Sequence, residues 1–111
     1  MSQPPVLWSP PVDVRRTSAV GRYLDWLAAE HGLRFDTYDE LWRWSVDDLE
    51  GFWGSIWERA GFASATGYEA VLANRTMPGA RWFPGATLNW AEHALRMPGR
   101  AADEVVMVGR S

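Results

Sequence analysis

The chain contains 111 residues, enough for one small domain, and with 47% hydrophobic and 23% charged residues its composition excludes an intrinsically disordered segment. Its net charge of −3 disfavours binding to the phosphate backbone of nucleic acids. The absence of cysteine excludes disulfides and thiolate metal sites, and because all 11 basic residues are arginine, this chain alone cannot use a lysine ammonium.

Residues 1–16 come first and hold four of the seven prolines. Proline has no backbone N–H for helix or sheet ladders, so we predict an extended arm over these residues, with Leu7 and Trp8 as its only anchors. The start of the chain lacks the basic and apolar regions of a signal peptide, and no apolar run approaches the roughly 18–20 residues that span a bilayer. We therefore expect a soluble, cytoplasmic protein.

A first helix is predicted over residues 19–31. Ser18 is a favourable N-cap residue at its start, and Gly32 stands just beyond its end, where glycine commonly terminates a helix. Between these two positions the apolar residues recur at helical spacing and form one stripe, which consists of Val20, Tyr23, Leu24 and Leu27.

The next region is predicted to contain a short helical turn and then a longer helix. Thr37 and Glu40 have capping-box spacing, which favours a helical turn that continues through Trp44. Ser45 is then expected to cap the longer helix, which should stop at Gly61. The apolar residues of that helix share an arc of about 140° and form a second stripe. They are Val46, Leu49, Phe52, Trp53, Ile56, Trp57 and Ala60.

Turn signals dominate the region after Gly61. Thr66 and Glu69 repeat the capping-box spacing, so we predict a short helix there. Pro-Gly pairs at residues 78–79 and 84–85 predict turns on either side of a bulky Arg-Trp-Phe triplet.

The last predicted elements are a helix over residues 88–96, which Pro98 and Gly99 should stop, and a strand over residues 104–108. Trp90 points away from the other apolar residues of the helix, so it needs a second contact surface. Residues 104–108 read Glu-Val-Val-Met-Val, which is typical of a buried strand, and no comparable segment follows to pair with it. Because a lone strand has nothing to hydrogen-bond, we expect the polypeptide to be incomplete.

Together these elements predict a mainly α fold in three parts. Residues 1–16 form the extended Pro-rich arm, and residues 17–99 form an aromatic helical segment whose short helices are joined by Pro/Gly turns. Residues 100–111 form a linker and a C-terminal β-strand that would begin the sheet of a larger α/β domain.

A search for catalytic or metal-binding patterns finds none. His31 and His93 are far apart and lack the spacing of a zinc-binding pair, so structural or solvated roles are favoured. Ser45 and Ser55 lie outside a Gly-x-Ser-x-Gly motif, and the loop at residues 61–67 fits neither the dinucleotide-binding nor the Walker pattern. We therefore expect no catalytic residue, no cofactor-binding residue and no metal ligand in this chain.

Aromatic residues are the unusual feature of the composition, with eight Trp, four Phe and three Tyr. Each ring can bury about 150–250 Å², more in total than a few short helices can enclose, so part of this surface should face something outside the chain. Packing is favoured over ligand stacking for Trp53 and Trp57, because both lie on the second apolar stripe. Arg81 can bind a carboxylate or phosphate ligand, but a position over an aromatic ring or a pairing elsewhere in the protein is favoured.

Two stretches resemble the opening region of the acetoacetyl-coenzyme A synthetases. The first is Leu-Trp-Arg-Trp-Ser-Val at residues 41–46, followed by Phe52, Trp53 and Trp57. The second, at residues 79–92, reads G-A-R-W-F-P-G-A-T-L-N-W-A-E and is similar to the family's G-A-R-W-F-P-G-A-x-L-N-Y-A-E. Leu-Trp-x-Pro at residues 7–10 extends the similarity over nearly the whole chain, and Pro-Gly-Ala after Trp-Phe favours the acetoacetate branch over the acetate-activating relatives.

The resemblance implies an N-terminal segment of an AMP-forming adenylating enzyme. Such an enzyme uses ATP, Mg²⁺ and coenzyme A to convert acetoacetate into acetoacetyl-CoA, with AMP and pyrophosphate as products. Its catalytic motifs lie downstream of the residues present here. The segment packs against the large adenylate-forming domain, whose first sheet would begin at residues 104–108. The family-signature packing residues are Trp42, Trp44, Phe52, Trp53, Trp57, Arg81, Trp82, Phe83, Gly85, Leu88 and Asn89.

Two other functions remain open on the residues alone. The chain fits a stand-alone helical interaction module that docks on a separate partner through its Trp-rich second stripe. It also fits an aromatic module that stacks on sugars or bases. Neither nucleic acid nor a membrane is expected as a partner.

Overall fold

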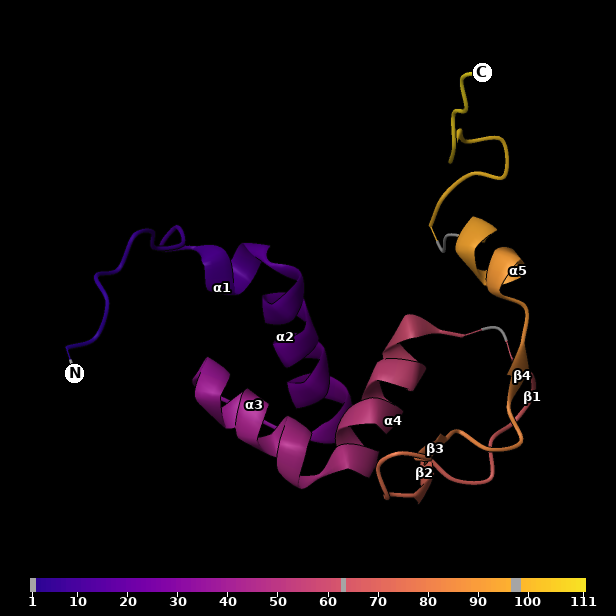
Figure 1. Ribbon diagram of the computed structural model, residues 1–111. Coiled ribbons are helices and arrows are strands. Elements are labelled where there is room, and N and C mark those ends of the chain that lie inside the picture. Colours follow the sequence, from indigo (N-terminus) through magenta and orange to yellow (C-terminus); the bar gives the residue numbers. More distant parts are fainter. Residues whose placement is uncertain (1, 63, 97–98) are drawn as a thin grey trace. The chain divides into compact units, whose positions relative to one another are not determined.

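The computed structural model describes residues 2–62, 64–96 and 99–111, and Figure 1 shows their helices and strands. The chain divides into two compact units, Met1–Arg43 and Trp44–Ser111, each of which has its own structure. Helices make up most of the regular structure in the described residues, and the strands are two or three residues long, which agrees with the expected mainly α fold. No helix in the described part of the chain combines the length and the apolar character needed to cross a bilayer.

The N-terminal arm has no regular structure over residues 2–11. Leu7 is 93% exposed and Trp8 is 75% exposed, so the prediction that these side chains anchor the arm is wrong. The arm's prolines cannot donate the backbone hydrogen bonds that would hold it against a helix or strand. The arm is also shorter than predicted, because α1 (Val14–Thr17) forms one helical turn at its end.

α2 (Ala19–His31) has the bounds and both caps that the sequence predicts. The Gly21 N–H donates to the Ser18 hydroxyl oxygen at 3.0 Å, and Gly32 adopts a left-handed conformation with a φ of 65°. The predicted stripe is buried at Tyr23, Leu24 and Leu27. It is shorter than predicted, because Val20 in the first turn is 46% exposed.

α1 lies against α2 because Gly21 has no side chain. An ideal Cβ at Gly21 would lie 1.8 Å from the Arg15 carbonyl oxygen, so a larger residue would displace α1. The Arg15 guanidinium donates to the Gly21 carbonyl oxygen at 2.9 Å and pairs with the Asp25 carboxylate at 2.8 Å. These contacts define the first unit, in which Leu41 is a further buried residue.

α3 (Tyr38–Asp47) begins with the predicted capping box. The Glu40 carboxylate accepts a hydrogen bond from the Thr37 N–H at 3.1 Å, and the Thr37 hydroxyl oxygen accepts one from the Glu40 N–H at 3.3 Å. The helix continues through Trp44 and Ser45. The prediction that Ser45 caps the next helix is therefore wrong.

α4 (Leu49–Ala60) is capped by Asp48, whose carboxylate accepts a hydrogen bond from the Gly51 N–H at 3.0 Å. Ser and Asp are both good N-cap residues. Asp48, not Ser45, is the cap, because the backbone leaves the helical conformation at Asp48, where φ is −116° and ψ is 73°. The predicted end is confirmed, because Gly61 follows the helix in the left-handed conformation with a φ of 61°.

The region after α4 forms short strands instead of the helix predicted after Thr66. Among the described residues there are two antiparallel pairs, β1 (Ser64–Thr66) with β4 (Thr87–Leu88) and β2 (Leu72–Asn74) with β3 (Arg81–Trp82). The Glu69 N–H donates to the Pro84 carbonyl oxygen at 2.9 Å, and the Phe83 N–H donates to the Val71 carbonyl oxygen at 2.8 Å. This segment therefore pairs with a distant one instead of closing local helical bonds.

α5 (Trp90–Leu95) is shorter than the helix predicted over residues 88–96. The Asn89 side-chain oxygen accepts a hydrogen bond from the Glu92 N–H at 3.1 Å and caps the helix, while Leu88 belongs to β4. The stop predicted at Pro98 lies outside the described residues.

The strand predicted over residues 104–108 is absent from the structure. Val105, Met107 and Val108 are 76%, 78% and 79% exposed. A strand needs a partner for its backbone hydrogen bonds, and no described segment of this chain pairs with these residues.

Candidate functional site

The second unit contains an aromatic cluster centred on Trp57 of α4. The Trp57 ring stacks on Phe83 with ring centroids 4.5 Å apart and an interplanar angle of 28°. Phe62 and Tyr68 approach the same indole at 5.0 and 5.4 Å, and Tyr68 meets Phe83 edge-on at 5.2 Å. The edge-on pairs and the stacked pair are arrangements that aromatic quadrupoles favour.

The backbone around Phe83 explains how that ring reaches α4. Phe83 has a φ of 45°, in the left-handed region that side chains rarely adopt, and Gly85 follows with a φ of 86°. The hydrogen bond from the Phe83 N–H to Val71 holds this turn against the β2 segment. On α4, Gly54 faces Val71, and an ideal Cβ at Gly54 would lie 3.4 Å from a Val71 methyl carbon, which is an ordinary van der Waals contact. The Trp57–Phe83 stack therefore depends on the hydrogen bond that holds the Phe83 turn against the segment preceding β2.

A second row of aromatic rings extends the cluster toward the start of the unit. Trp44 meets Phe52 edge-on at 5.7 Å, Phe52 meets Trp53 at 5.1 Å, and Trp53 meets Trp82 of β3 at 5.8 Å. The Trp-rich stripe of α4 is therefore partly covered by its own unit. Part of it stays accessible, since Trp53 is 41% exposed. Val46, which the sequence assigned to the same stripe, belongs to α3 instead and is 48% exposed.

Two hollows border this cluster and its neighbouring strands. One is a small apolar pocket of about 230 Å³, lined by Trp53, Ile56, Trp57, Phe62 and Phe83. The other is a wider groove of about 790 Å³ between β1, β4 and the start of α5. We name it the Trp90 groove, and its lining residues are Ser64, Ala65, Thr87, Leu88, Asn89, Trp90, Ala91 and Glu92.

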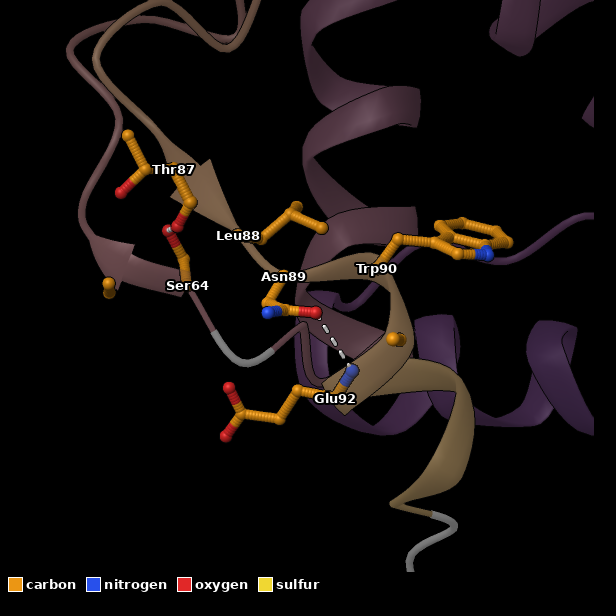
Figure 2. A pocket seen from close by; sticks show the side chains of 8 residues that line it. Ser64, Thr87, Leu88, Asn89, Trp90 and Glu92 are labelled. Atoms are coloured by element: carbon orange, nitrogen blue, oxygen red, sulfur yellow. Dashed lines mark hydrogen bonds between the residues drawn. The ribbon is translucent and has the colours of Figure 1, made fainter.

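Hydrogen bonds between the hydroxyl groups of β1 and backbone groups in and next to β4 hold the two strands together at this groove. The Ser64 hydroxyl donates to the Thr87 carbonyl oxygen at 2.9 Å. The Thr66 hydroxyl donates to the Gly85 carbonyl oxygen at 2.6 Å and accepts from the Thr87 N–H at 3.1 Å. The pairing register of the two strands shifts between Ser64 and Thr66. At this irregularity the Thr66 hydroxyl oxygen accepts the hydrogen bond that a backbone carbonyl oxygen would accept in a regular strand pair. Figure 2 shows the Trp90 ring pointing away from Ser64 and Thr87.

The structure brings six of the predicted packing residues into one aromatic cluster and separates the others from it. The six are Trp44, Phe52, Trp53, Trp57, Trp82 and Phe83. Arg81 is an exposed residue of β3, Gly85 occupies the turn, and Leu88 and Asn89 border the groove. Trp42 belongs to the first unit and is 54% exposed.

Three members of the cluster were missed from the sequence. Phe62, Tyr68 and His93 join it, the last through a tilted contact with Phe62 at 4.7 Å. Phe62 lies near the start of the loop at residues 61–67, and Tyr68 directly follows that loop. The signal in the sequence was the aromatic character of these two residues. Large rings at both ends of a loop of small residues indicate that the loop packs against other side chains.

The described residues do not form a catalytic or metal-binding constellation. No group of three or more His, Asp or Glu side chains among them is close enough to hold a metal ion. In the loop after α4, the hydroxyls of Ser64 and Thr66 are engaged with β4 and do not point into a phosphate cradle. What the arrangement offers is apolar and aromatic contact area.

Comparison with known proteins gives this arrangement a context. Acetoacetyl-coenzyme A synthetase of Rhizobium meliloti (strain 1021) is 33% identical over 103 residues, covering 93% of this chain and 16% of that protein. Malonamoyl-CoA synthetase vrtB of Penicillium aethiopicum is 30% identical over 97 residues, covering 84% of this chain and 13% of that protein. The solved structure of acetoacetyl-CoA synthetase from Streptomyces lividans is 47% identical with a TM-score of 0.77, covering 84% of this chain and 15% of that chain.

The chain therefore spans only about one-sixth of the length of these relatives. A family described as acetyl-coenzyme A synthetase N-terminus matches residues 38–94, which include α3, α4, all the described strands and most of α5. Because this match extends over more than half of the 111 residues, the chain belongs to the acetyl-coenzyme A synthetase N-terminus family.

Proposed function

We propose that this chain is the N-terminal structural segment of an acetoacetate–CoA ligase. The complete enzyme would convert ATP, acetoacetate and coenzyme A into acetoacetyl-CoA, AMP and pyrophosphate. One observation carries the proposal: 84% of the chain matches the Streptomyces lividans acetoacetyl-CoA synthetase at 47% identity and a TM-score of 0.77. Agreement in both sequence and backbone is more specific than a shared fold alone.

The role of the segment in this enzyme is structural. Within the described residues, no acidic or histidine cluster fits Mg²⁺, and the loop hydroxyls that would face a nucleotide phosphate are bound to β4. We therefore assign ATP, Mg²⁺ and coenzyme A to the remainder of the synthetase and derive no chemical step from this segment. Its own contribution is a folded aromatic surface on which that remainder packs.

The family-signature residues supply this surface in two ways. The aromatic members around Trp57 and Phe83 fix the shape of the second unit, because their rings contact one another at 4.5–5.8 Å. Exposed signature residues such as Trp42 and Arg81 would contact the large domain directly. In the complete enzyme, residues 104–108 would become the first strand of the sheet of the large domain. That domain would supply a neighbouring strand for their backbone hydrogen bonds, which the described residues do not provide.

The alternative is a stand-alone interaction module that docks through the second stripe. In the structure the rings of Trp53 and Trp57 on that stripe already pack on Trp82 and Phe83 of their own unit. This leaves less of the stripe for a separate partner than the sequence alone suggests.

The test is a chimera in which this chain replaces the matching region of the Streptomyces lividans synthetase. We expect acetoacetate-dependent and CoA-dependent AMP formation by the chimera at a rate within about tenfold of the parent enzyme, because a structural segment affects folding more than chemistry. The same enzyme without the region should be inactive, and the 111-residue chain alone should catalyse no ATP–pyrophosphate exchange. A folded chimera with no more activity than the deletion variant would refute the proposal.

A further inference from the structure

The Trp90 groove carries a group of exposed apolar side chains at the border of β4 and α5. Of its lining residues, Trp90 is 75% exposed and Leu88 is 41% exposed. Solvation of large apolar side chains is unfavourable, and tryptophan is enriched among the anchor residues of interfaces. The rings that contact Trp57 and Phe83 in the described residues belong to Phe62 and Tyr68, so Trp90 is not among them.

The polar side chains that line the groove are already engaged. The Asn89 oxygen caps α5, and the Glu92 carboxylate pairs with the Arg96 guanidinium at 3.1 Å. The hydroxyls of Ser64 and Thr87 bond within the β1–β4 pair. An apolar occupant would leave these bonds intact. An apolar partner therefore suits the groove, whose lining also includes Leu88, Trp90 and the small apolar residues Ala65 and Ala91.

We propose that the Trp90 groove is the docking surface for an apolar segment of the remainder of the synthetase polypeptide, with Trp90 as its anchor. This inference rests on the proposed function and identifies which face of the segment is covered in the full enzyme. The length of chain that the relatives have beyond this segment argues for that occupant. The chain spans 16% of the Rhizobium meliloti synthetase, so most of that polypeptide is available to cover the groove.

The size of the patch argues against a second copy of this chain as the occupant. Its two large apolar side chains expose roughly 200–300 Å², whereas a stable dimer buries about 600–1,000 Å² on each partner. A covalently attached partner needs less contact area, because the tether raises its effective concentration.

The test measures the solvent accessibility of Trp90 by oxidative footprinting with mass spectrometry of the tryptic peptides. The isolated 111-residue chain is compared with the Streptomyces lividans chimera. We expect the oxidation rate of Trp90 to fall by about fivefold or more in the chimera, because an interface anchor is fully desolvated. An unchanged rate in an active chimera would overturn the docking surface while leaving the proposed function standing, and an inactive chimera would instead count against the function.

A pair of variants supplies a second readout with a matched control. Trp8 is also 75% exposed but lies outside the region that the family matches. We expect Trp90→Ser to lower the melting temperature of the chimera more than Trp8→Ser does. Both variants should leave the circular dichroism of the isolated chain unchanged, because neither side chain is buried there. Equal effects of the two substitutions on the chimera would overturn the proposal.

Discussion

The ring of Trp57 in the last turn of α4 stacks on the ring of Phe83 in a turn with a left-handed backbone, with their centroids 4.5 Å apart. This contact joins the longest helix of the second unit to the segment that connects β3 and β4. It also explains why a bulky residue occupies a conformation that normally favours glycine. The aromatic contact offsets the backbone strain at Phe83.

Substitutions at Phe83 should therefore differ in stability in an unusual order, with glycine more stable than alanine. Phe83→Ala loses the ring and keeps the strained backbone, and we expect it to destabilise the second unit by about 2–3 kcal/mol. Phe83→Gly loses the same ring but relieves the strain, so it should be less destabilising than Phe83→Ala by about 1 kcal/mol. Urea unfolding followed by tryptophan fluorescence measures both. If alanine proves the more stable of the two, the strain argument is wrong.

Gly21 should be intolerant of any side chain. A Cβ at this position would collide with the Arg15 carbonyl oxygen, so Gly21→Ala should release α1 from α2 and break the ion pair between Arg15 and Asp25. Hydrogen exchange should then show loss of protection at residues 14–18 while α2 stays protected. Gly67→Ala is the control, since nothing lies within 4 Å of its added Cβ. Equal protection in the two variants would contradict the packing described.

The Asn89 cap should determine whether α5 forms. Asn89→Ala removes the acceptor for the Glu92 N–H and should cost about 1 kcal/mol of helix stability. Asn89→Asp retains a side-chain oxygen and should behave like the unsubstituted chain. Amide exchange at residues 91–95 provides the measurement, and equal exchange in both variants would show that the cap is dispensable.

The Thr66 hydroxyl should be needed for the pairing of β1 with β4. Thr66→Val leaves the Thr87 N–H and the Gly85 carbonyl oxygen without their partner, at a cost of about 1 kcal/mol. Thr66→Ser preserves the hydroxyl and should restore most of that stability. Thermal unfolding of the two variants distinguishes a hydrogen-bonding role from a packing role, because a methyl-dependent effect would reverse their order.

Acyl selectivity should not depend on this segment. An acetoacetyl-coenzyme A synthetase and a malonamoyl-CoA synthetase match this segment at 33% and 30% identity, although their names give different acyl groups. The Streptomyces lividans chimera should keep the parent's ratio of kcat/KM between acetoacetate and other short acids within about twofold, because selectivity resides in differential contacts at the reacting site. A shift of about tenfold or more would assign the segment a role in substrate choice.

Local signals explain which parts of the fold could be predicted from the sequence. α2 was predicted with both of its caps, since Ser18 and Gly32 act on the residues next to them. The end of α4 at Gly61 follows for the same reason. The junction before α4 was misplaced, because Ser45 and Asp48 are equally good caps and the choice depends on where the backbone turns.

Non-local pairing explains most of what could not be predicted. Thr66 and Glu69 have the spacing of a helix start, yet their segment pairs with the residues around Pro84. The same limit applies to the aromatic cluster. Trp57 was singled out by its place on the second stripe, and Phe83 by the family resemblance. Their mutual contact, however, depends on the β2–β3 pairing, and Tyr68 enters the cluster next to that pairing as well.

The central claim is that this aromatic segment is completed by the remainder of a synthetase. Isothermal titration of the 111-residue chain into Streptomyces lividans acetoacetyl-CoA synthetase that lacks its own matching region tests it most directly. The account predicts a 1:1 complex with the deletion variant and no complex with the intact enzyme, whose segment already occupies the site. Absence of binding to the deletion variant, or equal binding to both proteins, would contradict it.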